Sequence, residues 1–138
     1  MIMRRASVLL LASLLLASCS FGKGVGPANR SVDQFHRMLD AGRFAEIYEA
    51  SDPLFKKASK QTEFVRVLEV VHRKLGNFKS GSTVGWNDNV NASGEFVTLN
   101  YKSVYASGDA QEQFVFRITN DGADLVGFNI NSAALILN

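Results

Sequence analysis

The spacing of the apolar residues changes near Asn77, and this change restricts the chain to one class of fold. Before Asn77 the apolar residues recur every three or four positions, as on one side of an amphipathic helix. After Asn77 they alternate with polar residues, as on a half-buried strand. Helices followed by strands predict an α+β domain, with N-terminal helices packed on one face of a curved antiparallel β-meander of about four strands.

Four helical segments are expected in the first part of this domain. They cover residues 31–41, residues 43–50, a turn that begins at Asp52 and Pro53, and residues 60–75. Ser31 and Gln34 form a capping-box pattern, so we expect the first helix to begin at Ser31. Gly76 is expected to end the last helix, because glycine accepts the left-handed conformation common at helix ends.

Four strands are expected after the helices. They cover residues 78–86, 95–105, 111–119 and 125–131. Residues 87–94 are expected to form a turn, and Asn120-Asp121-Gly122 a tight hairpin. Alternation predicts that six strand residues face the helices: Val97, Leu99, Tyr101, Phe114, Phe116 and Ile118.

The N-terminus carries a targeting signal. Arg4 and Arg5 precede an apolar run of 12 residues, from position 6 to position 17. This run is too short for a lasting membrane span, which needs about 20 apolar residues. Leu16, Ala17, Ser18 and Cys19 then resemble the lipobox of bacterial lipoproteins, with the chain's single cysteine at the required position. The alternative is an ordinary signal peptide cleaved near Ala17.

The lipobox resemblance implies cleavage before Cys19 and attachment of fatty acyl chains such as palmitate to that residue. It divides the chain into a signal peptide (residues 1–18), a lipidated cysteine with a flexible tether (residues 19–30) and one α+β domain (residues 31–138). Several acyl chains hold a protein on a membrane stably, whereas one does so only marginally. Ser20 replaces the aspartate that signals retention at the inner membrane. In an organism with two membranes, we therefore expect the outer membrane, facing the periplasm.

The charge of the mature chain argues against nucleic acid as a partner. Without residues 1–18, the chain has 13 Lys and Arg residues against 13 Asp and Glu residues. Nucleic-acid binding depends on a surplus of basic side chains that meet the phosphates. With Cys19 lipidated, no cysteine remains for a disulfide, and we expect no cofactor. The expected partners are the membrane, through the lipid, and another envelope protein.

Three short sequence segments of the domain are similar to segments of the nuclear-transport-factor-2-like (NTF2-like) and cystatin-like small lipoproteins of unknown function. They are residues 38–44, 73–76 and 125–128. The resemblance implies a cone between helices and sheet, where pocket enzymes of this superfamily place acids, histidines or tyrosines. None of the six residues expected to face this cone is an acid. Proton transfer needs a titratable group there, so we expect no catalytic residue.

The remaining candidate residues point to structure more than to chemistry. His36 has Asp33 and Asp40 on the same helical side, but we expect a surface histidine, because a metal site needs three or four ligands. No metal site is expected. Tyr48, Trp86 and Tyr101 each combine an apolar body with a polar edge, which makes them the candidates for a pocket or interface.

The leading hypothesis is therefore a membrane-anchored, non-catalytic module that binds another protein through a concave sheet face or an exposed strand edge. The alternative is a carrier of a small apolar ligand, which would use the cone between helices and sheet. The least favoured hypothesis is a pocket enzyme. A filled cone favours the first hypothesis, an open apolar cone the second, and an open cone with His36 or a buried acid the third.

Overall fold

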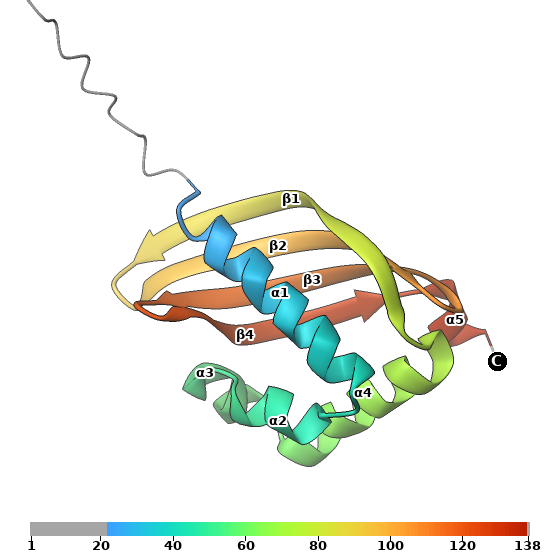
Figure 1. Cartoon of the computed structure of the whole chain (residues 1–138). Helices are drawn as coiled ribbons and strands as arrows, with labels where there is room; N and C mark the ends of the chain where they lie inside the picture. The colour runs from blue at the N-terminus through green and yellow to red at the C-terminus, as the bar shows by residue number, and fades with distance from the viewer. Residues whose placement is uncertain (1–21, 138) are drawn as a thin grey trace, which may run out of the picture.

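The computed structural model describes residues 22–137, which form five helices and one four-stranded sheet (Figure 1). The helices before the sheet are α1 (Val25–Asp40), α2 (Phe44–Glu49), α3 (Pro53–Ala58) and α4 (Gln61–Leu75). The strands are β1 (Phe78–Asn91), β2 (Gly94–Tyr105), β3 (Gly108–Thr119) and β4 (Gly122–Asn131), and α5 (Ala133–Ile136) follows. Neighbouring strands are antiparallel, in the order β1-β2-β3-β4.

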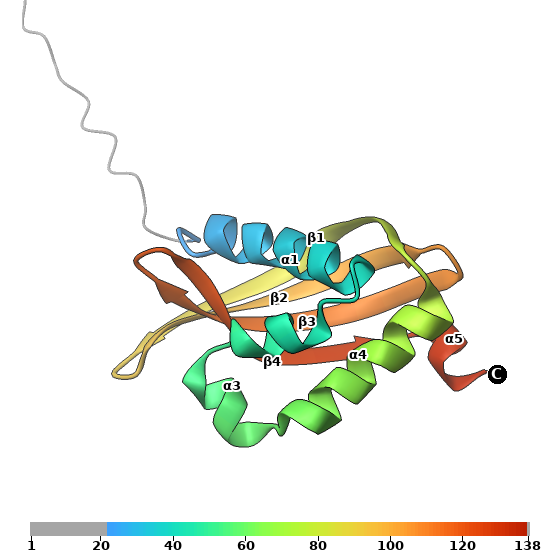
Figure 2. The same cartoon turned by 60° about the horizontal axis from the view of Figure 1, so that its bottom comes forward.

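The helices pack on one face of the sheet, and the other face is left open (Figures 1 and 2). α1 contacts all four strands, while α4 packs beside α1 and α2. The expected apolar stripes are buried between these layers, including Val32, Phe35 and Leu39 of α1. This arrangement confirms the predicted α+β fold, a set of N-terminal helices on one face of a four-stranded meander.

The expected start of the first helix at Ser31 is wrong, because α1 begins at Val25. Residues 25–30, which we expected in the tether, are therefore helical. Gly26 is a poor helix former, but burial of Ala28 against the sheet offsets its preference. Pro27 lies in the first turn of α1, where its missing N–H breaks no helical hydrogen bond. Ser31 makes a tertiary contact in place of a cap, since its Oγ donates to Ala123 O at 2.8 Å.

Two further expectations need correction in the sheet. Residues 87–91 are the end of β1, paired with residues 94–98 of β2, and the turn shrinks to Ala92 and Ser93. Pairing with a strong neighbouring strand overrides the turn preference of the asparagines. Alternation along residues 125–131 predicts Val126, Phe128 and Ile130 on the inner face. In β4, however, Leu125 is buried in place of Val126, because an irregularity in the β3–β4 register between Val115 and Phe116 changes which side chains face inward.

Candidate functional site

The cone between helices and sheet is filled by aromatic side chains. The ring centroid of Phe35 lies 5.1 Å from that of Phe114 and 4.8 Å from that of Phe128. Phe114 is fully buried, and the centroids of Phe114 and Phe128 are 5.2 Å apart. A hollow of about 90 Å³ lies at the margin of the cone, between Met38, Ile47 and Leu125. Ligand pockets usually have roughly 300–1,000 Å³, so this hollow is small for a ligand.

A group of polar side chains is buried inside the cone next to these rings. Glu112 is at its centre and accepts three hydrogen bonds. His36 Nε2 donates to Glu112 Oε2 at 2.8 Å, Tyr105 OH donates to Glu112 Oε1 at 2.5 Å, and Ser103 Oγ also donates to Glu112 Oε2. The imidazole of His36 stacks on Phe78 with 3.8 Å between ring centroids. We call His36, Ser103, Tyr105 and Glu112 the buried polar cluster.

The buried polar cluster contradicts two expectations from the sequence. His36 is 2% exposed and so is not a surface histidine. Glu112, also 2% exposed, is an acid on the cone side of β3, where we expected none. The alternation along β3 could have predicted the buried position of Glu112, because Glu112 is in phase with the buried Phe114. His36 likewise follows Val32 by four residues, which places both on the buried side of α1.

The electrostatics of the buried polar cluster favour a structural role. Burial raises the pKa of the Tyr105 hydroxyl far above its usual range, and the nearby Glu112 carboxylate raises it further. Burial also raises the pKa of Tyr101, with smaller contributions from Asp33 and Glu112. The members of the buried polar cluster make these hydrogen bonds inside an apolar core, and each of them is at most 2% exposed. The cluster can therefore fasten α1 to β2 and β3.

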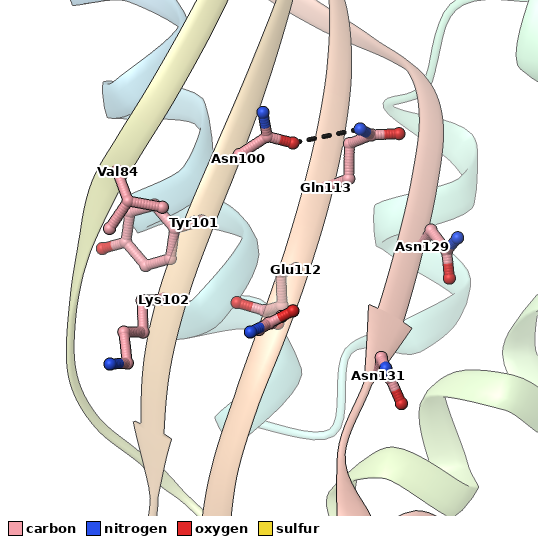
Figure 3. A pocket seen from close by; sticks show the side chains of 9 residues that line it. Val84, Asn100, Tyr101, Lys102, Glu112, Gln113, Asn129 and Asn131 are labelled. Carbon is pink, nitrogen blue, oxygen red and sulfur yellow. Dashed lines mark hydrogen bonds between the residues drawn. The ribbon is translucent and has the colours of Figure 1, made fainter.

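The open face of the sheet carries a polar hollow of about 410 Å³ (Figure 3). Side chains from β2, β3 and β4 line it in two rows across the strands. One row is Asn100, Gln113 and Asn129, and the other is Lys102, Gln111 and Asn131. We call these six side chains the amide cradle. Val84 of β1 borders it, and the backbones of Tyr101 and Glu112 form part of its floor, since their side chains are buried on the other face.

The side chains of the amide cradle are nearly free of intramolecular partners. Gln113 Nε2 donates to Asn100 Oδ1 at 3.0 Å, as Figure 3 shows. Within residues 22–137, the other four side chains make no hydrogen bond to the protein. Lys102 is the one charged member. A second hollow of about 260 Å³ shares Lys102, Gln111 and Asn131, and so extends the cradle toward Ala133.

The three aromatic candidates lie in separate places. Tyr48 is half-buried among the helices, where its hydroxyl donates to Ser59 O at 2.9 Å. Tyr101 is 6% exposed and lies in the cone, and Trp86 of β1 is 48% exposed at the margin of the sheet. The structure does not bring these residues together. The amide cradle is not among the sites predicted from the sequence. Its signal there is the outward phase of amide residues on β2, β3 and β4.

The lipobox residues Leu16, Ala17, Ser18 and Cys19 lie outside the described part of the chain. No helix within residues 22–137 combines the length and apolar character that crossing a membrane requires. Over the same residues, no three side chains of the metal-binding types lie close enough together to hold a metal ion.

This fold, with a closed cone and a polar open face, is that of a small α+β domain whose family is recognisable. The family described as "Protein of unknown function (DUF4019)" matches residues 31–127. This match covers more than half of the chain, so the protein belongs to that family.

Two further comparisons add nothing to this assignment. A crystal structure described as "a putative dehydratase from the NTF2-like family" of Streptomyces avermitilis is similar at 17% identity and a TM-score of 0.48. The similarity covers 80% of this chain and 94% of that one. At this level, the likeness assigns no activity to this protein. A search of curated proteins gave no match.

Proposed function

We propose that this protein is a membrane-anchored envelope lipoprotein that acts as a non-catalytic binding module for another envelope protein. The lipid on Cys19 would hold the domain at the membrane, most simply the outer membrane facing the periplasm where the cell has two. The amide cradle is the surface that we assign to the partner. The observation that carries this proposal is the contrast between a filled cone and an open, hollow sheet face.

The chemistry of the amide cradle suits an extended polar segment of the partner. Asparagine and glutamine side chains each offer two donors and an acceptor, so they can pair with peptide groups and polar side chains. Lys102 adds one positive charge, which favours a segment with a carboxylate at that end. The hollow continues from Asn100 toward Ala133, which gives the segment a direction along the strands.

The two alternative functions have less support. A carrier of small apolar ligands needs an empty apolar pocket, and the hollow of about 90 Å³ beside Met38 and Ile47 is too small for most ligands. A pocket enzyme needs an acid or base that a substrate can reach. Glu112 and His36 have the right chemistry for that role, but both are buried in a packed core.

Site-specific crosslinking in intact cells tests the assignment of the cradle. A photoreactive amino acid would replace Gln113, which is exposed in the cradle, or Arg66, which is exposed on α4 on the helical side. We expect a discrete protein adduct from position 113 and none from position 66. Placing arginine at Gln111 and Asn131 should block the hollow and reduce that adduct. Equal adducts from both positions, or none from position 113, would count against the cradle.

A further inference from the structure

The chain meets the sheet very soon after Cys19. Gly22 lies against the indole ring of Trp86, because a Cβ placed on Gly22 would be 3.3 Å from Trp86 Cη2. Gly24 lies still closer to β2, since a Cβ there would be 2.7 Å from Val97 Cγ2. Val25 N donates to Gly22 O at 3.1 Å, so this contact leads directly into α1. The packed domain therefore already includes Gly22.

This packing limits how far the domain can move from its anchor. Gly22 follows Cys19 by three residues, and three residues of extended chain span at most about 11 Å. The tether that we expected over residues 19–30 is thus much shorter, because its second half belongs to α1 and Gly22 contacts the sheet. A lipid on Cys19 would keep the Gly22 end of the domain within this distance of the bilayer.

The same end of the domain exposes two large apolar side chains. Trp86 is 48% exposed and Val90 is 74% exposed. They are four residues apart on β1, so they project from the same face of the strand. Figures 1 and 2 show that α1 begins at the end of the sheet where β1 finishes and β2 starts. A partly exposed tryptophan is typical of residues that lie at the level of the lipid headgroups.

The charges near these side chains indicate which kind of lipid they meet. Lys23 is exposed on this end, while Asp88 and Glu95 lie on the adjoining strands. Arg117 of β3 also lies at this end, beside Gly94, but it is paired with Asp52, so the nearby charges leave no surplus of positive charge that would attract an anionic bilayer. Contact through Trp86 and Val90 would therefore depend on apolar burial, and it should form on neutral phospholipids.

We propose that the end of the domain carrying Gly22, Trp86 and Val90 rests on the phospholipid surface that holds the lipid anchor. This inference rests on the proposed function, since it requires an acylated Cys19. It gives the domain one orientation on the membrane. The amide cradle begins at Asn100, five residues beyond Glu95 along β2, which is about 16 Å further along the strand. A partner could therefore reach the cradle while the Trp86 end contacts lipid.

Trp86 reports on this contact directly, because it is the chain's single tryptophan. The full mature lipoprotein would be reconstituted in phosphatidylcholine vesicles, and its fluorescence compared with that of the Cys19→Ala chain mixed with the same vesicles. We expect a blue-shifted emission and several-fold weaker quenching by acrylamide for the anchored protein. Lipids with a nitroxide near the headgroup should quench Trp86 only in the anchored protein.

Two variants test whether the short link and the orientation cause this effect. Ten Gly and Ser residues inserted between Ser20 and Phe21 should return acrylamide quenching toward the value of the unanchored chain. A tryptophan at Ser107, in the turn between β2 and β3, would replace the natural one in the double variant Trp86→Phe/Ser107→Trp. This residue is exposed at the opposite end of the sheet, so its fluorescence should stay accessible to acrylamide.

The outcomes separate this inference from the proposed function. A chain whose mass shows no acyl groups, and which leaves the membrane fraction, would overturn the anchor and the orientation together. An acylated, vesicle-bound protein with Trp86 as accessible as in the Cys19→Ala chain would overturn the orientation alone. The orientation would also be overturned if Trp86 stayed protected from acrylamide with the inserted spacer, or if a tryptophan at position 107 were equally protected.

Discussion

His36 and Glu112 are separated by 76 positions in the sequence, yet their side chains meet at 2.8 Å inside the core. The contact joins the middle of α1 to β3, and Ser103 and Tyr105 bring β2 into the same network. Each hydrogen-bonding oxygen of Glu112 has a donor, which a buried carboxylate requires. The buried polar cluster therefore links α1 to β2 and β3 in addition to the apolar packing between them.

Removing the central carboxylate should destabilise the protein strongly. We expect Glu112→Ala to lower the free energy of unfolding by about 3–5 kcal/mol, because it leaves the buried donors of His36, Ser103 and Tyr105 without their acceptor. Urea unfolding followed by circular dichroism would measure this. The matched control is Glu69→Ala, at an exposed acid of α4, which should change stability by less than about 0.5 kcal/mol. Equal effects of the two substitutions would contradict a structural role for the cluster.

Replacing both partners of the pair should cost less than removing one. In the double variant His36→Leu/Glu112→Met, apolar side chains of similar size replace the pair and no unpaired imidazole stays buried, so part of the stability lost in Glu112→Ala should return. The same urea titration measures this coupling. The comparison is with the single variants His36→Leu and Glu112→Met. If the double variant loses more free energy of unfolding than the two single variants lose together, the polar groups themselves, and not their pairing, hold α1 in place.

Alkaline pH should destabilise the folded protein through Tyr105. Its pKa is raised in the folded state by burial and by Glu112, whereas in the unfolded chain it returns to about 10. Below about pH 10 both states keep the proton, so the contribution to stability is fully present there. Above that pH the unfolded chain loses the proton first, and stability falls by up to about 1.4 kcal/mol per pH unit.

Tyr105→Phe isolates this effect from other titrations. The variant is expected to be less stable at neutral pH, because Glu112 loses a donor, but its stability should fall less steeply above about pH 10. Some slope should remain, since the pKa of Tyr101 is also raised by burial. Urea titrations across this pH range measure both slopes. Identical slopes, or tyrosinate absorbance from all three tyrosines before unfolding, would contradict the expectation.

The fold could be predicted from the sequence because its apolar periods are regular. The α4 stripe and the alternating residues of β2 and β3 are buried as expected, and the hairpin at Asn120 and Asp121 forms where the turn residues indicate. Errors occurred where contacts between distant segments override local preference. α1 includes Gly26 because Ala28 packs on the sheet, and β1 continues through asparagines because β2 supplies its pairing.

The sites were harder to predict than the fold. Glu112 has the inward phase of β3, but a lone acid in an apolar series gives no sign of its partners, which come from α1 and β2. The amide cradle depends on the register of three strands, since Asn100, Gln113 and Asn129 become neighbours only when β2, β3 and β4 pair. Such register depends on turns and bulges as well as on the hydrophobic pattern, and the irregularity between Val115 and Phe116 was not predicted.

The close approach of α1 to the sheet can be tested with two neighbouring glycines. A Cβ on Gly24 would be 2.7 Å from Val97 Cγ2, whereas a Cβ on Gly26 would meet only Arg30 Nη1, at 3.6 Å. We expect Gly24→Ala to lower the free energy of unfolding by about 1–3 kcal/mol through overpacking. Gly26→Ala should be neutral or stabilise by up to about 1 kcal/mol, since alanine favours the helix. Thermal unfolding of both variants measures the difference, and a destabilising Gly26→Ala with a neutral Gly24→Ala would refute this packing.

The lipid anchor proposed at Cys19 has a direct chemical test. Lipoprotein acylation uses the cysteine sulfur, and alanine offers no nucleophile at that position, so Cys19→Ala should take up no labelled palmitate and should leave the membrane fraction. The matched control is Ser20→Ala, which keeps the sulfur and should still be labelled. Subcellular fractionation and the mass of the purified chain measure the result. A Cys19→Ala protein that stays with the membrane, together with an unlabelled parent protein, would mean that Cys19 is not the attachment site and that the apolar run before it serves only for export.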